Sequence, residues 1–174
     1  MTSTVKQPRP QTEQKPERRP EEQPEWRFEP APVPYDQALA VMEVRVQALL
    51  DKTAPDLLWF LEHPPLYTGG TSAKAADLLA PRFPVYQTGR GGQYTYHGPG
   101  QRVVYVMKDL RAQPDIRAYV YHLEEWIIRA LKMLGITGER RAGRIGIWVD
   151  QTPYGRQGEA KIAAIGVRVK KWIA

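Results

Sequence analysis

Residues 90–101 read Arg-Gly-Gly-Gln-Tyr-Thr-Tyr-His-Gly-Pro-Gly-Gln, and this stretch decides how the rest of the chain is interpreted. Its glycines permit positive φ angles and a close approach of the backbone to a ligand. Arg90 offers a fixed fork of hydrogen-bond donors. Side chains alternate along a strand, so Thr95 and His97 share one face and Tyr94 and Tyr96 the other. We predict a glycine-rich loop over 89–92 that enters a strand.

Other kinds of loop compete with a substrate-binding interpretation. A phosphate-binding loop or a dinucleotide-binding fingerprint leads into a helix N-terminus. Here a strand follows, and no Lys-Ser or Lys-Thr pair closes the loop, so the sequence disfavours both. A glycine-rich hairpin with a structurally satisfied histidine remains open from these residues alone.

The flanking sequence predicts a mixed α/β (α+β) domain. Apolar residues at spacings of three and four predict helices over 35–51 and 115–134, the second begun by Asp115 and ended by Gly135. A loop over 66–71, a short helix over 73–79 and a hairpin connection over 155–158 are also expected. Short apolar runs predict strands over 56–62, 85–88, 94–97, 102–108, 145–150 and 161–173, with a Gly-Pro-Gly turn joining the third to the fourth.

The N-terminus differs in composition from the rest of the chain. Residues 1–30 are rich in Pro, Glu, Gln, Arg and Lys and cannot bury enough apolar surface to offset their ordering entropy. We expect a disordered tail to about Trp26, followed by a docked extended stretch. The predicted division is a tail over 1–30 and one domain over 31–174.

Composition excludes several classes of site. The chain has no cysteine, so it holds no disulfide, thiolate metal site or cysteine nucleophile. Its three histidines form no HxxxH or HExxH pair, and we expect neither a metal nor a cofactor. No run reaches the roughly 18–20 apolar residues of a membrane helix, and no secretory signal is present. We expect a cytoplasmic protein without a membrane partner.

The net charge of +6 is concentrated near the C-terminus, where residues 131–174 hold nine basic and three acidic residues. A basic surface attracts nucleic acid, anionic lipid or an acidic protein, although it can also be a solvated face without a partner. Five of the nine basic residues are candidates for such a contact: Arg140, Arg141, Arg144, Lys170 and Lys171.

Four blocks of sequence together resemble the lipoate-protein ligase B family, the octanoyl-[acyl-carrier-protein]:protein N-octanoyltransferases. The first block is residues 90–101 with Tyr105 four positions later. The others are Leu-Glu-His-Pro-Pro-Leu-Tyr-Thr at 61–68, Gly-Ile-Trp-Val at 146–149 and Lys-Ile-Ala-Ala-Ile-Gly-Val-Arg at 161–168. The resemblance covers residues 35–174, with the blocks in the family's order.

The resemblance implies a fold related to the catalytic core of biotin and lipoate ligases. It also implies octanoyl transfer from acyl carrier protein to a lysine of a lipoyl domain, through a thioester on an enzyme cysteine. Lys161 matches the lysine that activates this cysteine and acts as acid and base. We expect the apolar neighbours of Lys161 to bury it and to lower its pKa. The residues expected to line the acyl pocket are Arg90, Gly91, Gly92, Gln93, Tyr94, Thr95, Tyr96 and His97, with Ala164, Ile165 and Gly166 forming the opposite wall.

The resemblance also implies partners. They are octanoyl-acyl carrier protein and the lipoyl domains of 2-oxoacid dehydrogenases or of the glycine cleavage H protein. Because acyl carrier proteins are acidic, the basic C-terminal quarter is expected to steer them, and no nucleic-acid partner is expected.

The sequence departs from the family in one respect. The family's catalytic cysteine lies beyond the block that contains Lys161, and these 174 residues contain no cysteine. We interpret the chain as a shortened form of a longer enzyme, inactive alone, whose final strand stops in mid-pattern and leaves an exposed sheet edge.

Three alternatives stay open. The first is an inactive remnant that binds acyl groups or carrier protein. The second is an ATP-dependent lipoate or biotin ligase, which ATP dependence would reveal. The third is a nucleic-acid-binding protein, which salt-sensitive affinity would reveal.

Overall fold

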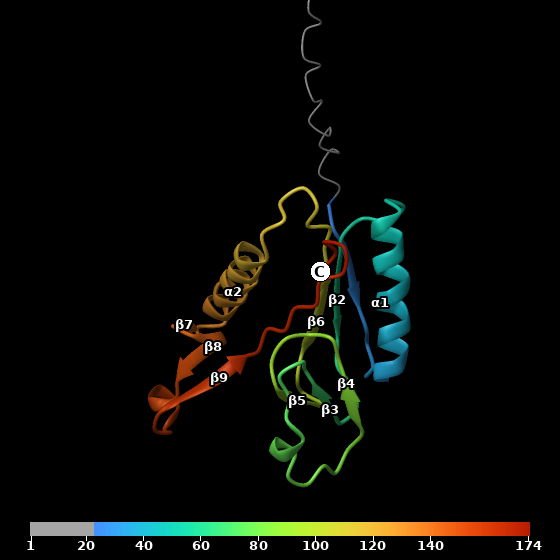
Figure 1. Cartoon of the computed structure of the whole chain (residues 1–174). Coiled ribbons are helices and arrows are strands. Elements are labelled where there is room, and N and C mark those ends of the chain that lie inside the picture. The colour runs from blue at the N-terminus through green and yellow to red at the C-terminus, as the bar shows by residue number, and fades with distance from the viewer. Residues whose placement is uncertain (1–22) are drawn as a thin grey trace, which may run out of the picture.

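The computed structural model describes residues 23–174, which form three three-stranded sheets and two long helices (Figure 1). Residues 1–22, and with them most of the predicted tail, lie outside the described part. The helices are α1 (Tyr35–Leu50) and α2 (Ile116–Met133), with short 3-10 turns η1 (Ala75–Asp77) and η2 (Thr152–Tyr154). The strands are β1 (Glu25–Phe28), β2 (Leu57–Leu61), β3 (Leu66–Gly69), β4 (Val85–Gln87), β5 (Tyr94–His97), β6 (Val103–Met107), β7 (Glu139–Arg141), β8 (Arg144–Asp150) and β9 (Glu159–Ala163).

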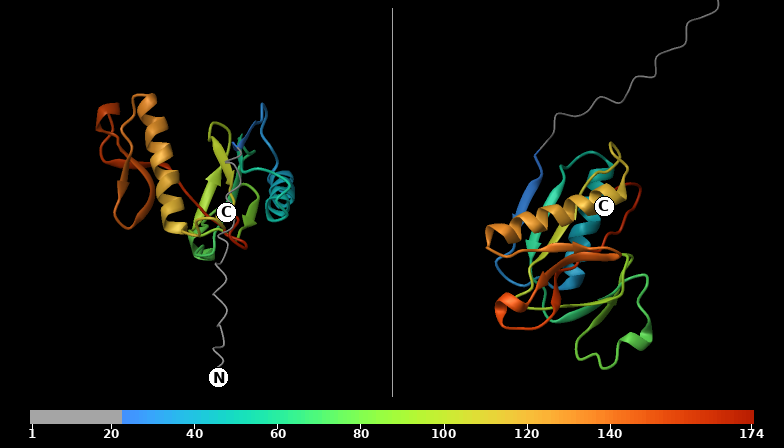
Figure 2. Two further views of the ribbon diagram at one scale, coloured as in Figure 1. Left: turned by 90° about the horizontal axis from the view of Figure 1, so that it is seen from above. Right: turned by 90° about the vertical axis from the view of Figure 1, so that its left-hand side faces the viewer.

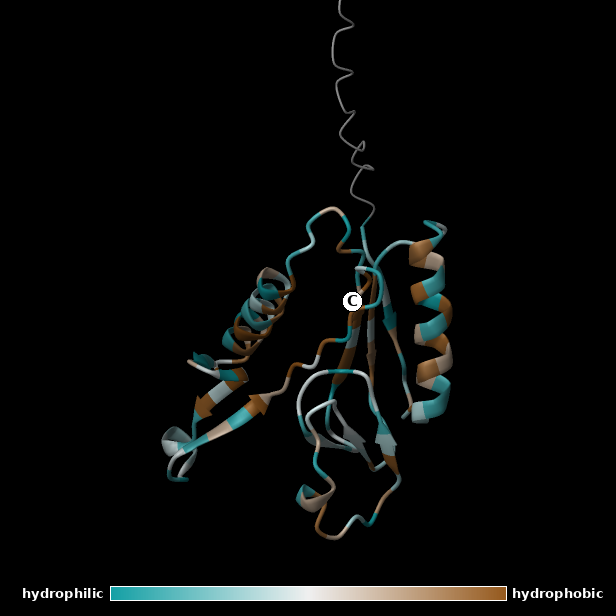
Figure 3. Cartoon of the chain, in the orientation of Figure 1, coloured by the Kyte–Doolittle hydropathy of each residue, from teal (hydrophilic) through white to brown (hydrophobic). Residues whose placement is uncertain are grey.

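The main core lies between α1 and the sheet β1-β2-β6. In this sheet β1 is parallel and β6 antiparallel to the central strand β2. Because side chains alternate along β2, Leu57, Trp59 and Leu61 all point to one face, and each is at most 1% exposed. Figure 3 shows the hydrophobic residues concentrated on β2 and β6, beside α1. The buried cluster comprises Ala38, Leu49, Leu57, Trp59, Leu61, Met107 and Ile173.

The helix α2 lies on the opposite side of this sheet from α1, as Figure 2 shows. Its Trp126 ring meets Phe60 edge to face, with ring centroids 6.2 Å apart. Its other neighbour is the sheet β7-β8-β9. Buried Glu124 joins the two, because its carboxylate accepts from the backbone N–H of Gly146 (3.2 Å) and from Nε of Arg140 (3.0 Å).

The third sheet, β4-β3-β5, carries the glycine-rich loop. Its central strand β3 is parallel to β4 and antiparallel to β5. The loop over 89–92 therefore connects the two edge strands of this sheet, β4 and β5. This places the loop beside the end of β3, where Gly70 N–H donates to Gln93 O and Thr71 N–H to Arg90 O.

The last residues of the chain return to the first sheet. Lys108 and Ala174 exchange two backbone hydrogen bonds of 2.9 and 3.0 Å, and Ile173, 1% exposed, enters the main core. Between β9 and this contact, residues 164–169 form no strand and cross from one sheet to another (Figure 1). The prediction of one strand over 161–173 is therefore wrong. The alternating apolar pattern of the sequence continues past Ala163, but the backbone hydrogen-bond ladder with β8 ends there.

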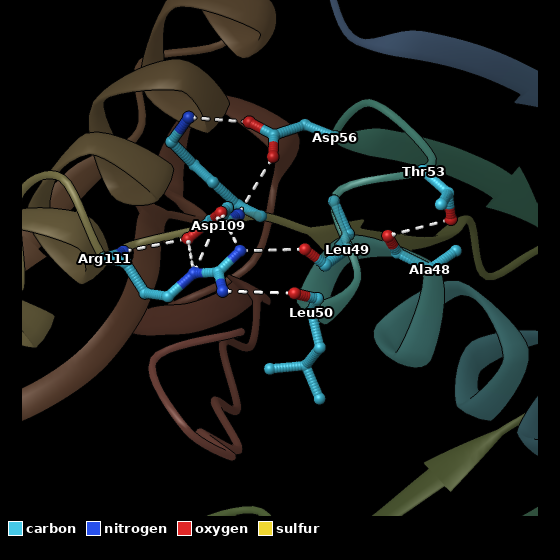
Figure 4. A network of polar contacts seen from close by, with 8 residues as sticks. Ala48, Leu49, Leu50, Thr53, Asp56, Asp109 and Arg111 are labelled. Carbon is cyan, nitrogen blue, oxygen red and sulfur yellow. Dashed lines mark hydrogen bonds and ion pairs between the residues drawn. The ribbon is translucent and has the colours of Figure 1, made fainter. Parts of the chain in front are cut away.

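A polar network fixes this end of the molecule, as Figure 4 shows. Arg111 donates to the backbone carbonyls of Leu49 (2.8 Å) and Leu50 (3.2 Å) at the end of α1, where Leu49 O also accepts from Lys52 N–H at 3.2 Å. Asp109 pairs with Arg111 at 2.6 Å. Asp56, just before β2, accepts from the Lys108 ammonium at 2.8 Å and from Asp109 N–H at 2.9 Å. The network ties α1 to the ends of β2 and β6.

The structure confirms the predicted mixed α/β class and both helices. Asp115 caps α2 by accepting from Ala118 N–H at 2.9 Å, and Gly135 follows with a φ of 75°. The connection over 155–158 joins β8 to β9 as expected, through two glycines with positive φ.

Three local predictions are wrong. Residues 66–69 form β3 rather than a loop, because Pro64-Pro65 only separates this strand from β2. The third and fourth predicted strands, over 94–97 and 102–108, are not paired with each other across the Gly-Pro-Gly turn, because β5 pairs with β3 and β6 with β2. Residues 25–28 form β1, whose Trp26 and Phe28 rings stack with Phe60 at 5.5 and 4.6 Å. This strand is the docked extended stretch expected after about Trp26, but it places the start of the folded part before residue 31.

Candidate functional site

Arg90 organises the glycine-rich loop from within. Its Nη2 donates to Thr68 O (2.9 Å), Thr68 Oγ1 (2.8 Å), Gln93 O (3.2 Å) and Thr95 Oγ1 (3.1 Å). Its Nη1 donates to Gly91 O at 2.9 Å. The guanidinium is thus committed to the loop and its flanking strands. Its fork of donors sets the loop's shape and leaves Nη2 no spare capacity for a ligand.

The segment after β9 packs against this loop. Gly91 N–H donates to Val167 O at 3.3 Å. A Cβ on Gly166 would lie 2.7 Å from Arg90 Cδ, and a Cβ on Gly89 would lie 2.9 Å from Arg168 Nε. Each glycine therefore gives space to an arginine of the other segment. The two predicted walls, 90–97 and 164–166, are brought together through these contacts.

His97 is held at both ring nitrogens. Gln101 Nε2 donates to the Tyr96 carbonyl, so Gln101 Oε1 faces His97 and accepts from its Nδ1–H at 2.7 Å. His97 Nε2 therefore accepts from the Thr68 hydroxyl at 3.0 Å. Thr68 in turn accepts from Arg90, which makes a continuous chain of hydrogen bonds from loop to histidine.

His63 is a site residue that the sequence prediction did not select. It is fully buried, and its ring lies 6.0 Å from that of His97. Since the Val33 carbonyl can only accept, His63 Nδ1–H donates to it (2.6 Å), and Nε2 accepts from the Tyr105 hydroxyl (2.8 Å). Tyr35 completes the group, with its ring 5.5 Å from His63.

The signals for these residues were present in the sequence. His63 and Tyr105 both belong to the blocks that carry the family resemblance, but only the fold reveals that they meet. Burial lowers the pKa of His63 and of His97, and in His97 the Arg90 charge adds to this effect. Burial also raises the pKa of Tyr105 and of Tyr35. The two histidines and the two tyrosines are therefore neutral at physiological pH, whereas Arg90 is charged.

The strand β5 divides the remaining predicted residues between two faces. Thr95 and His97 point toward Arg90 and Thr68, as the alternation predicts. Tyr96, 45% exposed, faces the other way, where its ring meets Tyr67 and Phe83. Tyr94 is half-buried against Gly69, where a Cβ would lie 2.9 Å from its ring. Gln93 and Gly92 contribute backbone carbonyls, to Arg90 and to Ser72 N–H.

Lys161 lies in β9, directly opposite Trp148 of β8. Its Nζ is 4.9 Å from the centre of the Trp148 ring. The expected burial is wrong, because Lys161 is exposed on β9, which is an edge strand of its three-stranded sheet. Among the described residues Lys161 has no carboxylate within salt-bridge distance, and its contacts are with β8 rather than with the glycine-rich loop.

Three of the nine basic residues in the C-terminal quarter form ion pairs within residues 23–174. Arg140 bonds Glu124 and Glu125, and Arg141 and Arg144 both bond Glu159. Of the five basic residues expected to steer acidic partners, only Lys170 and Lys171 have no ion pair among residues 23–174. The net positive charge available to a partner at this end is therefore smaller than the sequence suggested.

A hollow of about 590 Å³ lies elsewhere, between the end of α2 and the sheet β7-β8-β9. None of its lining residues belongs to the loop 89–97. The lining residues of the hollow are Ile136, Val149, Gln151, Tyr154, Arg156, Ala160, Lys161 and Ile162.

No helix within residues 23–174 is long and apolar enough to cross a membrane.

The chain is similar to a known family of catalytic domains over most of its length. The model of the lipoyl protein ligase A/B catalytic domain matches residues 34–174. An octanoyltransferase of Rhodopseudomonas palustris (strain BisA53) is 60% identical over 150 residues, which are 86% of this chain and 64% of the relative. An octanoyltransferase of Hyphomonas neptunium is 61% identical over 152 residues, which are 86% of this chain and 65% of the relative. The chain thus spans less than two thirds of the length of these two relatives.

Among solved structures, a bi-partite lipoate protein ligase from Thermoplasma acidophilum superimposes with a TM-score of 0.55 at 17% identity. The match covers 85% of this chain and 57% of that one. At this identity the likeness concerns the fold alone, which is that of a lipoate ligase catalytic core.

Proposed function

Because the chain belongs to the lipoyl protein ligase A/B catalytic-domain family, we propose that it serves octanoyl transfer in protein lipoylation. The donor is octanoyl-acyl carrier protein, and the acceptor is a lysine of a lipoyl domain. Curated relatives at about 60% identity that bear the name octanoyltransferase support this choice within the family.

One structural observation carries the proposal. The glycine-rich loop and the segment 164–168 are packed together by reciprocal glycine–arginine contacts and by the bond from Gly91 N–H to Val167 O. Within residues 23–174, the N–H groups of residues 164–168 donate to no backbone carbonyl, so we assign them to the thioester carbonyl as charge develops on its oxygen. A catalytic domain that holds an acyl group needs such a juxtaposition.

The reaction takes place in two acyl transfers. A cysteine thiolate attacks the thioester carbonyl of octanoyl-acyl carrier protein, and the carrier's thiol leaves with a proton. The ε-amine of the lipoyl-domain lysine then attacks the enzyme thioester, forms the amide and returns the thiol. We assign the proton transfers to Lys161. The thiol is not among these 174 residues, so the chain alone is expected to form no octanoyl thioester.

The partners follow from this chemistry. We assign octanoyl-acyl carrier protein as the donor, and lipoyl domains of 2-oxoacid dehydrogenases or of the glycine cleavage H protein as the acceptors. No cofactor takes part in either step, because the donor thioester already activates the acyl group. We place the reaction in the cytoplasm, as the sequence predicts.

A chimaera tests the proposal. The matched 150 residues of the Rhodopseudomonas palustris (strain BisA53) octanoyltransferase are replaced by those of this chain, and the rest of that relative is kept. With octanoyl-acyl carrier protein and an apo lipoyl domain, mass spectrometry should detect octanoyl-lysine without ATP. The chimaera with Lys161→Met should fold but lose at least about 100-fold in rate, as expected for removal of a general acid–base.

Two outcomes would contradict the proposal. One is a folded chimaera that transfers no octanoyl group. The other is a transfer that requires ATP and free octanoate, which would identify the chain as the ligase alternative.

A further inference from the structure

The Gly-Ile-Trp-Val block of β8 has no role in the proposed reaction as described so far. Its alternate residues, Gly146 and Trp148, lie on the same face of the strand as the side chain of Lys161. Lys161 faces Trp148 directly in the antiparallel ladder. The block and the lysine are therefore neighbours in space, although Lys161 comes 13 positions after Trp148 in the sequence.

Gly146 gives room to the stem of the lysine. A Cβ there would lie 3.3 Å from Lys161 Cδ, 3.4 Å from Cε and 2.5 Å from the Ala163 carbonyl. The φ of Gly146 is 112°, a conformation that L side chains rarely adopt. Only glycine at this position lets the methylene stem lie flat on β8.

Trp148 receives the charged end of the lysine. The Nζ lies 4.9 Å from the ring centroid, within the roughly 6 Å range of a cation–π interaction, and tryptophan is the most favourable partner for it. Such a contact orients an ammonium without giving it a counter-charge.

The nearby carboxylate is kept away from Lys161. Glu159, two residues before Lys161 in β9, pairs with Arg141 at 2.7 Å and also with Arg144. Arg144 in addition stacks on Trp148, with Cζ 4.2 Å from the ring centroid. The two arginines neutralise Glu159, so Lys161 has an aromatic face rather than a carboxylate as its neighbour.

We propose that Gly146 and Trp148 are positioning residues for Lys161: the glycine gives room to its methylene stem, and the aromatic face holds its ammonium in place. The proposal rests on the role given to Lys161 in the proposed function. The contact fixes the direction of the ammonium, while the side chain stays exposed and able to reach a reaction partner.

The test uses the 174-residue chain and nuclear magnetic resonance of its lysine side chains. The Cε–Hε signal of Lys161 is assigned by its loss in Lys161→Arg. In the wild type it should lie upfield of the other lysine signals, because the end of the side chain lies over the Trp148 ring, which shields protons above its face. Trp148→Leu should move it to the position of free lysine, and Trp148→Phe should restore part of the shift.

A matched control separates this effect from general damage to the fold. Tyr121→Leu removes another exposed cation–π contact, that of Arg140, whose Cζ is 4.0 Å from the Tyr121 ring centroid. It should leave the Lys161 signal in place. A Lys161 signal that is unshifted in the wild type, or unchanged in a folded Trp148→Leu variant, would overturn the proposal. Because this readout needs no octanoyl transfer, its failure is distinct from failure of the chimaera.

Discussion

Gly166 lies against the side chain of Arg90 so closely that a Cβ on Gly166 would be 2.7 Å from Arg90 Cδ. Arg90 cannot easily give way, because its guanidinium is bonded to Thr68, Gln93 and Thr95. Two segments separated by some 75 residues in the sequence are thereby fitted to each other. This contact defines the candidate site, and the first prediction follows from it.

Gly166→Ala should destabilise the chain by about 1–3 kcal/mol, the usual cost of overpacking at a tight contact. Chemical denaturation monitored by tryptophan fluorescence measures the change. Gly91→Ala is the matched control, because a Cβ there meets nothing within 4 Å and should cost much less. Equal losses for the two variants would show that the contact is not selective for glycine.

Arg90→Lys should destabilise the loop although the charge is kept. A lysine ammonium cannot reproduce the planar fork that bonds Thr68, Gly91, Gln93 and Thr95. We expect a loss of about 1.5–3 kcal/mol and faster hydrogen exchange at residues 89–93. Arg102→Lys is the control, since this exposed arginine has only a 3.8 Å contact to Glu62 and should change the stability by less than about 0.5 kcal/mol. A stable Arg90→Lys variant with unchanged exchange would contradict the role given to Arg90.

Stability should decrease as the pH falls below about 6.5. Burial lowers the pKa of His63 and of His97 in the folded chain, whereas in the unfolded chain both keep the ordinary value near 6.5. Below that value the unfolded chain binds more protons than the folded one, so acid favours unfolding, and above it the effect disappears. Thermal unfolding between pH 7.5 and 5.5 measures the slope. His97→Gln should flatten it, and the exposed His122→Gln should not. A wild-type slope of zero would refute the buried neutral state of both rings.

Arg111→Lys should weaken the junction between α1 and the main sheet. It removes the paired donation to the carbonyls of Leu49 and Leu50, at an expected cost of about 1 kcal/mol. Arg129→Lys, which changes only an exposed pair with Glu125, should have almost no effect on the free energy of unfolding. Comparable effects would mean that the helix end does not depend on Arg111.

Local pattern was enough to predict most elements. The periodicity of residues 115–134 and the cap by Asp115 led directly to α2, and alternation along residues 94–97 gave the faces of β5 correctly. These features depend on near neighbours in the sequence. The pairing of strands depends on distant ones, so the sequence did not reveal that β5 and β6 enter different sheets.

The same distinction applies to the candidate site. Arg90 and Gly166 were predicted to lie on opposite walls of one pocket, and the fold brings them into contact. The exposure and ion pairing of individual charged side chains were harder to predict. Lys161 proved exposed, and Arg140, Arg141 and Arg144 proved paired with glutamates, because burial and ion pairing are set by tertiary packing. His63 escaped selection for the same reason, since its partners Val33 and Tyr105 lie 30 and 42 residues away.

The most direct test is to titrate the ¹⁵N-labelled 174-residue chain with octanoyl-pantetheine and to map the amide signals that move. The glycine-rich loop and the segment after β9 should respond together, with the largest changes at Gly91, Gly92 and residues 164–166. The hollow beside α2, followed through Val149 and Tyr154, should remain unchanged. Changes confined to that hollow, or no changes up to millimolar ligand, would contradict the assignment of the acyl site to the contact between Arg90 and Gly166.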